Sequence, residues 1–163
     1  MIPKAELLTW LKKLDKRLER DIVIVAVGGT AMTLLGLKST TIDVDFCISS
    51  HARKFFEDAL DKKFKVDIFL DGYIFSEQLP RDYVEKAKEI ARFTHVTLKV
   101  LSPEDIVITK TARLNARDEE DIRVMAKYVN KEVLRERFEQ VVKTYAGNDE
   151  QYRRNFNVVM KYL

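Results

Sequence analysis

The sequence has few of the residues that define several common protein classes. Its single cysteine, Cys47, cannot form a disulfide within the chain. No group of cysteines and histidines has the spacing of a zinc site. No apolar run approaches the roughly 20 residues that cross a bilayer, and the amphipathic first 20 residues lack the uninterrupted apolar region of a signal peptide. These absences exclude a disulfide scaffold, a zinc finger and a helical membrane protein, and we expect a cytoplasmic protein.

The composition is typical of a folded globular domain. Of the 163 residues, 46% are hydrophobic and 34% are charged, which is enough apolar material for one well-buried core. The net charge of +3 permits binding to phosphates or nucleic acid but does not indicate it. Because no repeat, linker or low-complexity tract interrupts the chain, we expect a single domain over 1–163. It would consist of a sheet-and-helix core over 1–101 and a helical segment over 102–163.

Hydrophobic periodicity predicts a small mixed β-sheet flanked by helices, in the α/β (α+β) class. Leucines at helical spacing predict an amphipathic helix within the first 20 residues. Short β-branched or alternating runs predict strands at residues 22–27, 42–48, 65–70, 90–93 and 97–101, the last two as a hairpin. Shorter helices are expected at residues 30–35 and 51–62. Ser102, as an N-cap followed by proline, begins a run of helices that continues to residue 163.

The stretch VGGTAMTLLGLKSTTIDVDF, residues 27–46, combines two costly features. Adjacent glycines, Gly28 and Gly29, follow a buried strand, although glycine is entropically unfavourable unless the backbone needs it. Asp43 and Asp45 then stand in an apolar strand, although buried carboxylates are unfavourable unless something neutralises them. Alternation along a strand places both carboxylates on one face, about 6–7 Å apart along the chain. Together these features indicate a binding site.

A third acid, Asp67, lies in the next apolar strand. Oxygen ligands of this kind suit Mg²⁺, which takes one or two carboxylates together with substrate phosphates. Three carboxylates suit a site of two ions, about 3.5–4 Å apart, that clamps a phosphoryl displacement. The glycines, with the helix N-terminus after them and the hydroxyl of Thr30, would receive the phosphates. The sequence therefore predicts a site for a nucleoside triphosphate.

In this order and spacing, these residues resemble the signature of the DNA polymerase β-type nucleotidyltransferase superfamily. That signature is an apolar residue with Gly-Gly or Gly-Ser, a gap of about ten residues, an Asp-x-Asp strand and a later third acid. The segment LSPEDIVITKTARLNARDEEDI, residues 101–122, resembles the helix that follows the sheet in minimal bacterial and archaeal members related to AbiEii-type toxins. The two resemblances together cover residues 22–125.

The resemblance implies a role for each matching position. Asp43, Asp45 and Asp67 would be the catalytic, metal-binding residues for two Mg²⁺ ions, with Mn²⁺ as an alternative. Residues that would contact the nucleotide, ATP or another triphosphate, are Gly28, Gly29, Thr30, Lys110, Arg113 and Arg117. The basic residues, three to four apart, would share a helical face, with Asp118 holding Arg117. Without the resemblance, the same residues read as a solvated stripe paired with Glu104, Asp118 or Asp121.

One departure from the family pattern affects substrate contact. Many relatives carry an arginine four residues before the first acid of the pair. Here Ser39 occupies that position, with Lys38 beside it, so the basic contact is shifted or lost.

Several functions stay open at this stage. The first is transfer of a nucleoside monophosphate to a hydroxyl of tRNA, a protein or a small molecule, in a toxin–antitoxin setting and as a homodimer or a monomer. The second is a binding or antitoxin-like regulatory module with the same fold and no turnover. The third is a plain nucleic-acid binder, whose affinity would depend strongly on salt and survive loss of the acids.

Overall fold

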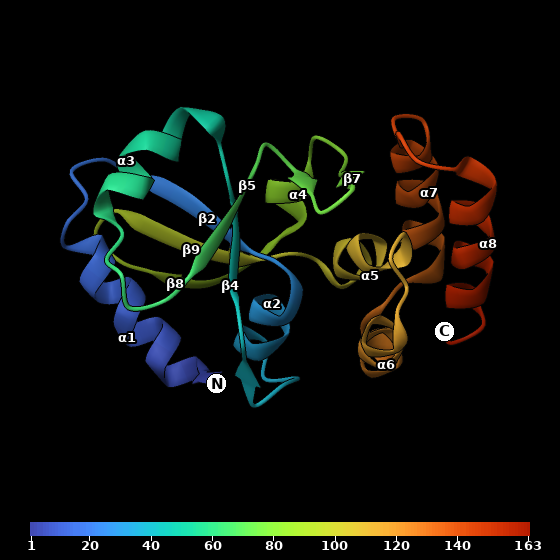
Figure 1. Cartoon of the computed structure of the whole chain (residues 1–163), viewed down its shortest axis with the longest axis horizontal. Coiled ribbons are helices and arrows are strands. Elements are labelled where there is room, and N and C mark those ends of the chain that lie inside the picture. The colour runs from blue at the N-terminus through green and yellow to red at the C-terminus, as the bar shows by residue number, and fades with distance from the viewer. The chain divides into compact units, whose positions relative to one another are not determined.

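The computed structural model describes all residues, 1–163, which divide into two compact units. The first unit comprises residues 1–71 and 84–101, and the second comprises 72–83 and 102–163 (Figure 1). The first unit holds a mixed β-sheet with helices, and the second is mainly helical. This confirms the predicted α+β class with a helical C-terminal part. No helix of the structure combines the length and the apolar character that crossing a membrane demands.

Five strands form the sheet of the first unit, in the order β5-β4-β2-β9-β8. Their bounds are β2 Ile22–Ala26, β4 Val44–Ile48, β5 Val66–Leu70, β8 Lys88–Arg92 and β9 Val96–Val100. The pairs β2–β9 and β4–β5 are parallel, whereas β2–β4 and the predicted β8–β9 hairpin are antiparallel. Two shorter strands, β1 (Ile2–Pro3) and β3 (Thr40–Thr41), pair with each other.

Helices α1 (Lys4–Asp15) and α3 (Arg53–Ala59) supply the apolar cover of one sheet face. The ring of Trp10 in α1 lies 6.4 Å from that of Phe46 in β4, and Phe56 in α3 lies 6.3 Å from Phe46 on another side. All three rings are buried. Side chains alternate along a strand, so Asp45, next to Phe46, points to the opposite face of β4.

The second unit contains a short hairpin and the C-terminal helices. The hairpin strands are β6 (Tyr73–Ile74) and β7 (Glu77–Gln78). The helices are α5 Pro103–Thr111, α6 Ala116–Met125, α7 Lys131–Val142 and α8 Asp149–Met160. Helix α4 (Tyr83–Lys86) begins at the last residue of the 72–83 segment and continues into the first unit. Short 3₁₀ turns lie at Ser50–Ala52 in the first unit and at Ala126–Tyr128 in the second. The predicted cap is confirmed, because the Ser102 hydroxyl accepts a hydrogen bond from the Asp105 amide.

The aromatic residues near the C-terminus pack between α7 and α8. The Phe138 ring stacks on Phe156 at 3.8 Å and lies 4.8 Å from Tyr152. Tyr145 in turn stacks on Tyr152 at 4.2 Å. These ring contacts contribute to the packing of α7 against α8.

Two predicted element boundaries are wrong in ways that concern the site. The strand expected over 42–48 begins at Val44, so Asp43 lies in the bend before it. Helix α2 (Gly28–Leu34) begins at Gly28 itself, not at Thr30. Gly28 adopts a positive φ of 56°, which glycine tolerates without strain, and so forms the turn from Val27 into the helix.

Candidate functional site

Two of the three predicted acids stand side by side. Asp45 and Asp67 are register partners on the parallel strands β4 and β5. Neighbouring strands lie about 4.8 Å apart, and register partners point to the same face of the sheet. Both side chains are half-buried. The sheet therefore fixes the carboxylates of Asp45 and Asp67 as a pair on the face opposite Phe46.

Asp43 is placed differently from the expectation. Its side chain is exposed, and no ladder hydrogen bonds of β4 fix its direction, because it lies before the strand. The main chain at this point is nevertheless held firmly. The carbonyl of Asp43 accepts hydrogen bonds from the hydroxyls of Thr30, at 3.0 Å, and Thr41, at 2.8 Å.

Thr30 connects the Gly-Gly turn to the Asp-x-Asp segment. Its fully buried hydroxyl donates to the Asp43 carbonyl and accepts from the Asp45 amide at 3.0 Å. A threonine hydroxyl carries a single hydrogen, so in this arrangement it cannot also donate to a phosphate. The structure thus gives the Thr30 side chain a positioning role, and only its backbone N–H is left for the predicted phosphate contact.

Local structure favours glycine at both positions, independently of any ligand that approaches the turn. Gly28 needs its positive φ, and a Cβ added at Gly29 would lie 3.2 Å from the Thr41 hydroxyl oxygen. Val27, immediately before them, donates its amide hydrogen to the Asp45 carbonyl at 3.1 Å. The turn therefore lies against the acidic strand.

The carboxylate oxygens at this site supply only part of the ligand shell of a hard cation such as Mg²⁺. No group of three or more histidine, cysteine, aspartate or glutamate side chains in the chain could hold a metal ion by itself. The Asp45–Asp67 pair supplies two carboxylates, the number that Mg²⁺ commonly takes from protein while phosphates and water fill its other positions. The residues present therefore fit an ion that arrives with a phosphate ligand, and do not form a closed protein cage.

The predicted basic residues lie in the second unit and do not share a helical face. Helix α5 ends at Thr111 and α6 begins at Ala116, so the expected continuous face through 110, 113 and 117 is wrong. Asn115 causes the break, because its side chain caps α6 in a reciprocal capping box with Asp118. Lys110 lies in α5, Arg113 in the connection, and Arg117 in the exposed first turn of α6.

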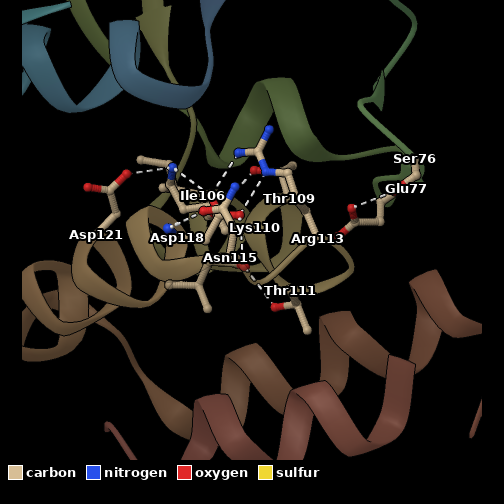
Figure 2. Close-up of polar contacts among 11 residues, drawn as sticks. Ser76, Glu77, Ile106, Thr109, Lys110, Thr111, Arg113, Asn115, Asp118 and Asp121 are labelled. Atoms are coloured by element: carbon tan, nitrogen blue, oxygen red, sulfur yellow. Dashed lines mark hydrogen bonds and ion pairs between the residues drawn. The ribbon is translucent and has the colours of Figure 1, made fainter. Parts of the chain in front are cut away.

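Lys110 is enclosed by acids and is not part of a solvated stripe. Only 3% of its side chain is exposed, and its ammonium group lies 2.9 Å from an Asp121 oxygen and 3.8 Å from Asp118 (Figure 2). The pairing of this residue with Asp118 and Asp121, which the solvated-stripe interpretation expected, is confirmed. The expected exposure of Lys110 to solvent is wrong. Its positive charge is already balanced within the unit.

Arg113, and not Arg117, is the residue that Asp118 holds. The Arg113 Nε and Nη2 atoms each donate to Asp118 at 2.7 Å, a bidentate pair (Figure 2). The Arg113 guanidinium, the Asn115 amide and nearby Lys110 hold the pKa of the Asp118 carboxyl below its usual range, against the effect of burial. Half of the Arg113 side chain stays exposed, so its guanidinium is fixed yet accessible.

One buried titratable group had no sequence signal. Glu77 in β7 is 1% exposed, and its carboxyl accepts hydrogen bonds from the hydroxyls of Tyr152, at 3.0 Å, and Ser76, at 3.2 Å. Burial raises its pKa to about 8, although these hydrogen bonds and Arg113 act in the other direction. A lone glutamate 75 residues from its tyrosine partner cannot be recognised from local pattern.

Comparison with known proteins supplies the family. Residues 5–163 match the family model described as "Nucleotidyltransferase of unknown function (DUF6036)". The chain belongs to this nucleotidyltransferase family. Searches of curated proteins and of solved structures found no match.

Membership of this nucleotidyltransferase family agrees with the superfamily resemblance of the Gly-Gly and Asp-x-Asp segments. It gives the chain a general nucleotidyltransferase character over nearly its whole length. The narrower relationship to AbiEii-type toxins stays a prediction, and the family's description names no substrate.

Proposed function

We propose that this chain is a metal-dependent nucleotidyltransferase that moves a nucleoside monophosphate from a triphosphate to a hydroxyl of an acceptor. A bond forms between the acceptor oxygen and the α-phosphorus, while the bond from that phosphorus to the leaving pyrophosphate oxygen breaks. The observation that carries the proposal is the register of Asp45 against Asp67 on neighbouring strands, beside the turn at Gly28.

Asp45 and Asp67 would hold Mg²⁺, or Mn²⁺ in its place, with Asp43 as a third ligand from the adjoining bend. When bound, such ions would stabilise negative charge on the phosphate oxygens and favour loss of the proton from the attacking hydroxyl to water. The protein's part is to fix the direction of the carboxylates. The register of β4 and β5 fixes the carboxylates of Asp45 and Asp67. At Asp43, the Thr30 hydroxyl fixes the main chain and not the carboxylate.

Each unit offers groups of its own that suit phosphate oxygens in this proposal. In the first, the backbone amides of Gly28, Gly29 and Thr30 would receive phosphate oxygens. In the second, Arg113 is the best suited of the basic residues, because Asp118 fixes it and half of it is exposed. Lys110 and Arg117 would add positive charge, Lys110 only by exchanging a carboxylate partner for a phosphate.

The acceptor is left as one of three classes in this proposal: tRNA, a protein or a small hydroxylated molecule. A toxin–antitoxin setting, a cytoplasmic location and a homodimer are likewise proposals, based on the superfamily resemblance and the composition.

A second candidate function is a binding or antitoxin-like module with the nucleotidyltransferase fold and no turnover. One observation favours it: the protein side chains alone form no group of three metal ligands. The third alternative, a plain nucleic-acid binder, has no structural observation that favours it.

Calorimetric titration with ATP, GTP, CTP and UTP, each with and without Mg²⁺, separates the two candidates. The enzyme requires Mg²⁺-dependent binding of at least one nucleotide, lost in Asp45→Asn/Asp67→Asn and kept in a control, Glu120→Gln/Glu136→Gln, which neutralises two exposed acids. Absence of binding to any nucleotide favours the module. Unchanged Mg²⁺-dependent binding in the Asp45→Asn/Asp67→Asn variant would contradict the proposed site.

A further inference from the structure

The first unit contains a hollow that the proposed function does not use. Its volume is about 400 Å³, within the range of small-ligand pockets. Its walls come from residues 17–20, which follow α1, and from residues 51–59 of the 3₁₀ turn and α3. The lining includes the buried side chains of Leu18 and Ala59 together with charged side chains.

This pocket lies at the other end of the strands from the acidic pair. Strand β2 starts at Ile22, just after the pocket residues 17–20, and ends beside Gly28. Strand β4 runs antiparallel to it, starting near Asp43 and ending just before the pocket residues 51–59. At about 3.3 Å per residue, five residues separate the two sites by about 15 Å. A ligand in the pocket is therefore distinct from a nucleotide at the Gly-Gly turn.

Basic side chains are prominent in the lining of the pocket. Arg17, Arg20 and Lys54 line it together with His51. Arg17 is held in place, because its Nε donates to the Ala59 carbonyl at 2.7 Å and its Nη2 lies 3.7 Å from Asp61. Neither Arg20 nor Lys54 forms an ion pair with a carboxylate in the structure. Their charges are available for an anion, and phosphate is one of the anions that guanidinium and ammonium groups bind well.

The rest of the lining fits a sugar and a flat ring. Glu19 and Asp58, also in the wall, are acceptors of the kind that bind ribose hydroxyls in nucleotide sites. Phe55 offers an aromatic face, against which the Arg20 guanidinium lies 5.7 Å from the ring centroid. Carboxylates beside cations would disfavour a plain polyanion, whereas a nucleotide presents both phosphate and hydroxyl groups to them.

We propose that this pocket, between residues 17–20 and α3, is a binding site for a mononucleotide, taken up without a metal ion. Arg20 and Lys54 would bind the phosphate, Glu19 and Asp58 the ribose hydroxyls, and Phe55 the base. The proposal rests on the pocket alone and stands whether or not the acidic pair is catalytic.

The test is titration of the whole protein with AMP in EDTA, followed by calorimetry. We expect one molecule to bind, and Arg20→Gln/Lys54→Gln to weaken the affinity at least tenfold. Lys12→Gln/Lys13→Gln, which removes the same charge from the exposed face of α1, should bind AMP like the wild type. Asp45→Asn/Asp67→Asn should also bind AMP normally, which separates this test from the test of the proposed function.

Nuclear magnetic resonance of the wild-type protein locates the ligand independently of any variant. AMP should shift the backbone amide signals of Leu18, Phe55 and Ala59, and inorganic phosphate or adenosine alone should bind at least tenfold more weakly. No binding of AMP at millimolar concentration would overturn the proposal. So would shifts confined to the Gly-Gly turn, equal affinity in Arg20→Gln/Lys54→Gln, or equal affinity for inorganic phosphate.

Discussion

At the scale of single residues, the Thr30 hydroxyl is the contact on which the candidate site depends most. It joins the carbonyl of Asp43 and the amide of Asp45, two groups of the acidic segment, to the turn that begins at Gly28. Sequence reasoning placed Thr30 at the site, but as a phosphate ligand. The actual role could not be read from the sequence, because it depends on how α2 packs against β4.

Thr30→Val should therefore affect both stability and binding. It removes a donor and an acceptor at a fully buried position, and we expect the free energy of unfolding to fall by about 1–3 kcal/mol. Mg²⁺-dependent nucleotide affinity should fall with it, because the carboxylates lose their fixed position. Urea unfolding and calorimetry measure the two effects. Thr30→Ser keeps the hydroxyl and should stay close to wild type; equal losses in both variants would contradict this role.

Glu77 makes stability depend on pH. Its pKa is about 8 in the folded protein, because of burial, and 4.5 is the ordinary value. The folded state therefore keeps a proton that the unfolded chain releases between pH 4.5 and 8. The contribution of Glu77 to the free energy of unfolding is therefore greatest below about pH 4.5 and is lost as pH rises to about 8. The groups that face it are Tyr152, Ser76, Arg113 and Asp118.

We expect Glu77→Gln to remove this pH dependence. Relative to wild type, the variant should gain unfolding free energy from pH 4.5 to 8, by several kcal/mol at most, since one pKa unit corresponds to about 1.4 kcal/mol. Urea unfolding at a series of pH values measures the difference. A constant difference across this range would show that Glu77 ionises normally in the folded protein.

At the scale of elements, an ion pair connects α5 to α7. The Arg137 guanidinium binds Asp105 through two hydrogen bonds, at 2.7 and 2.8 Å, and Asp82 through a third at 2.7 Å. Arg137 and Asp105 are both buried. Removing one partner of such a pair leaves an uncompensated buried charge.

Arg137→Ala should accordingly lower the free energy of unfolding by about 3–5 kcal/mol. Arg153→Ala is the matched control, because Arg153 pairs with Glu139 at 2.9 Å on the exposed surface, where solvent screens the pair, and its loss should be much smaller. Chemical denaturation of both variants measures the difference. Similar small losses in the two would mean that the buried pair contributes little.

The sequence predicted most elements but not their exact ends. Periodicity of two located the strands, and helical spacing located α1, because both patterns reflect which side chains the core buries. The break between α5 and α6 was missed, although Asn115 is a good capping residue, because the basic residues at 110, 113 and 117 suggested one continuous face. The Asn115 cap begins a new helix at this point, and the spacing of the basic residues gives no sign of that break.

At the scale of the whole molecule, the general nucleotidyltransferase character could be predicted from short segments. The Gly-Gly and Asp-x-Asp spacing was sufficient, and the family match over residues 5–163 agrees with it. The assignment of residues 72–83 to the helical unit could not be predicted, because the contacts of Glu77 and Asp82 join positions more than 50 residues apart. Nothing in the local sequence marks such contacts.

The most direct measurement of the central claim is transfer of label from α-³²P nucleoside triphosphates to components of a cell extract. With wild-type protein and Mg²⁺, we expect label in one class of acceptor, and none after EDTA is added. Asp43→Ala and Asp45→Asn should abolish the labelling while leaving the unfolding midpoint within a few degrees of wild type. Labelling that is undiminished in Asp45→Asn would contradict the account.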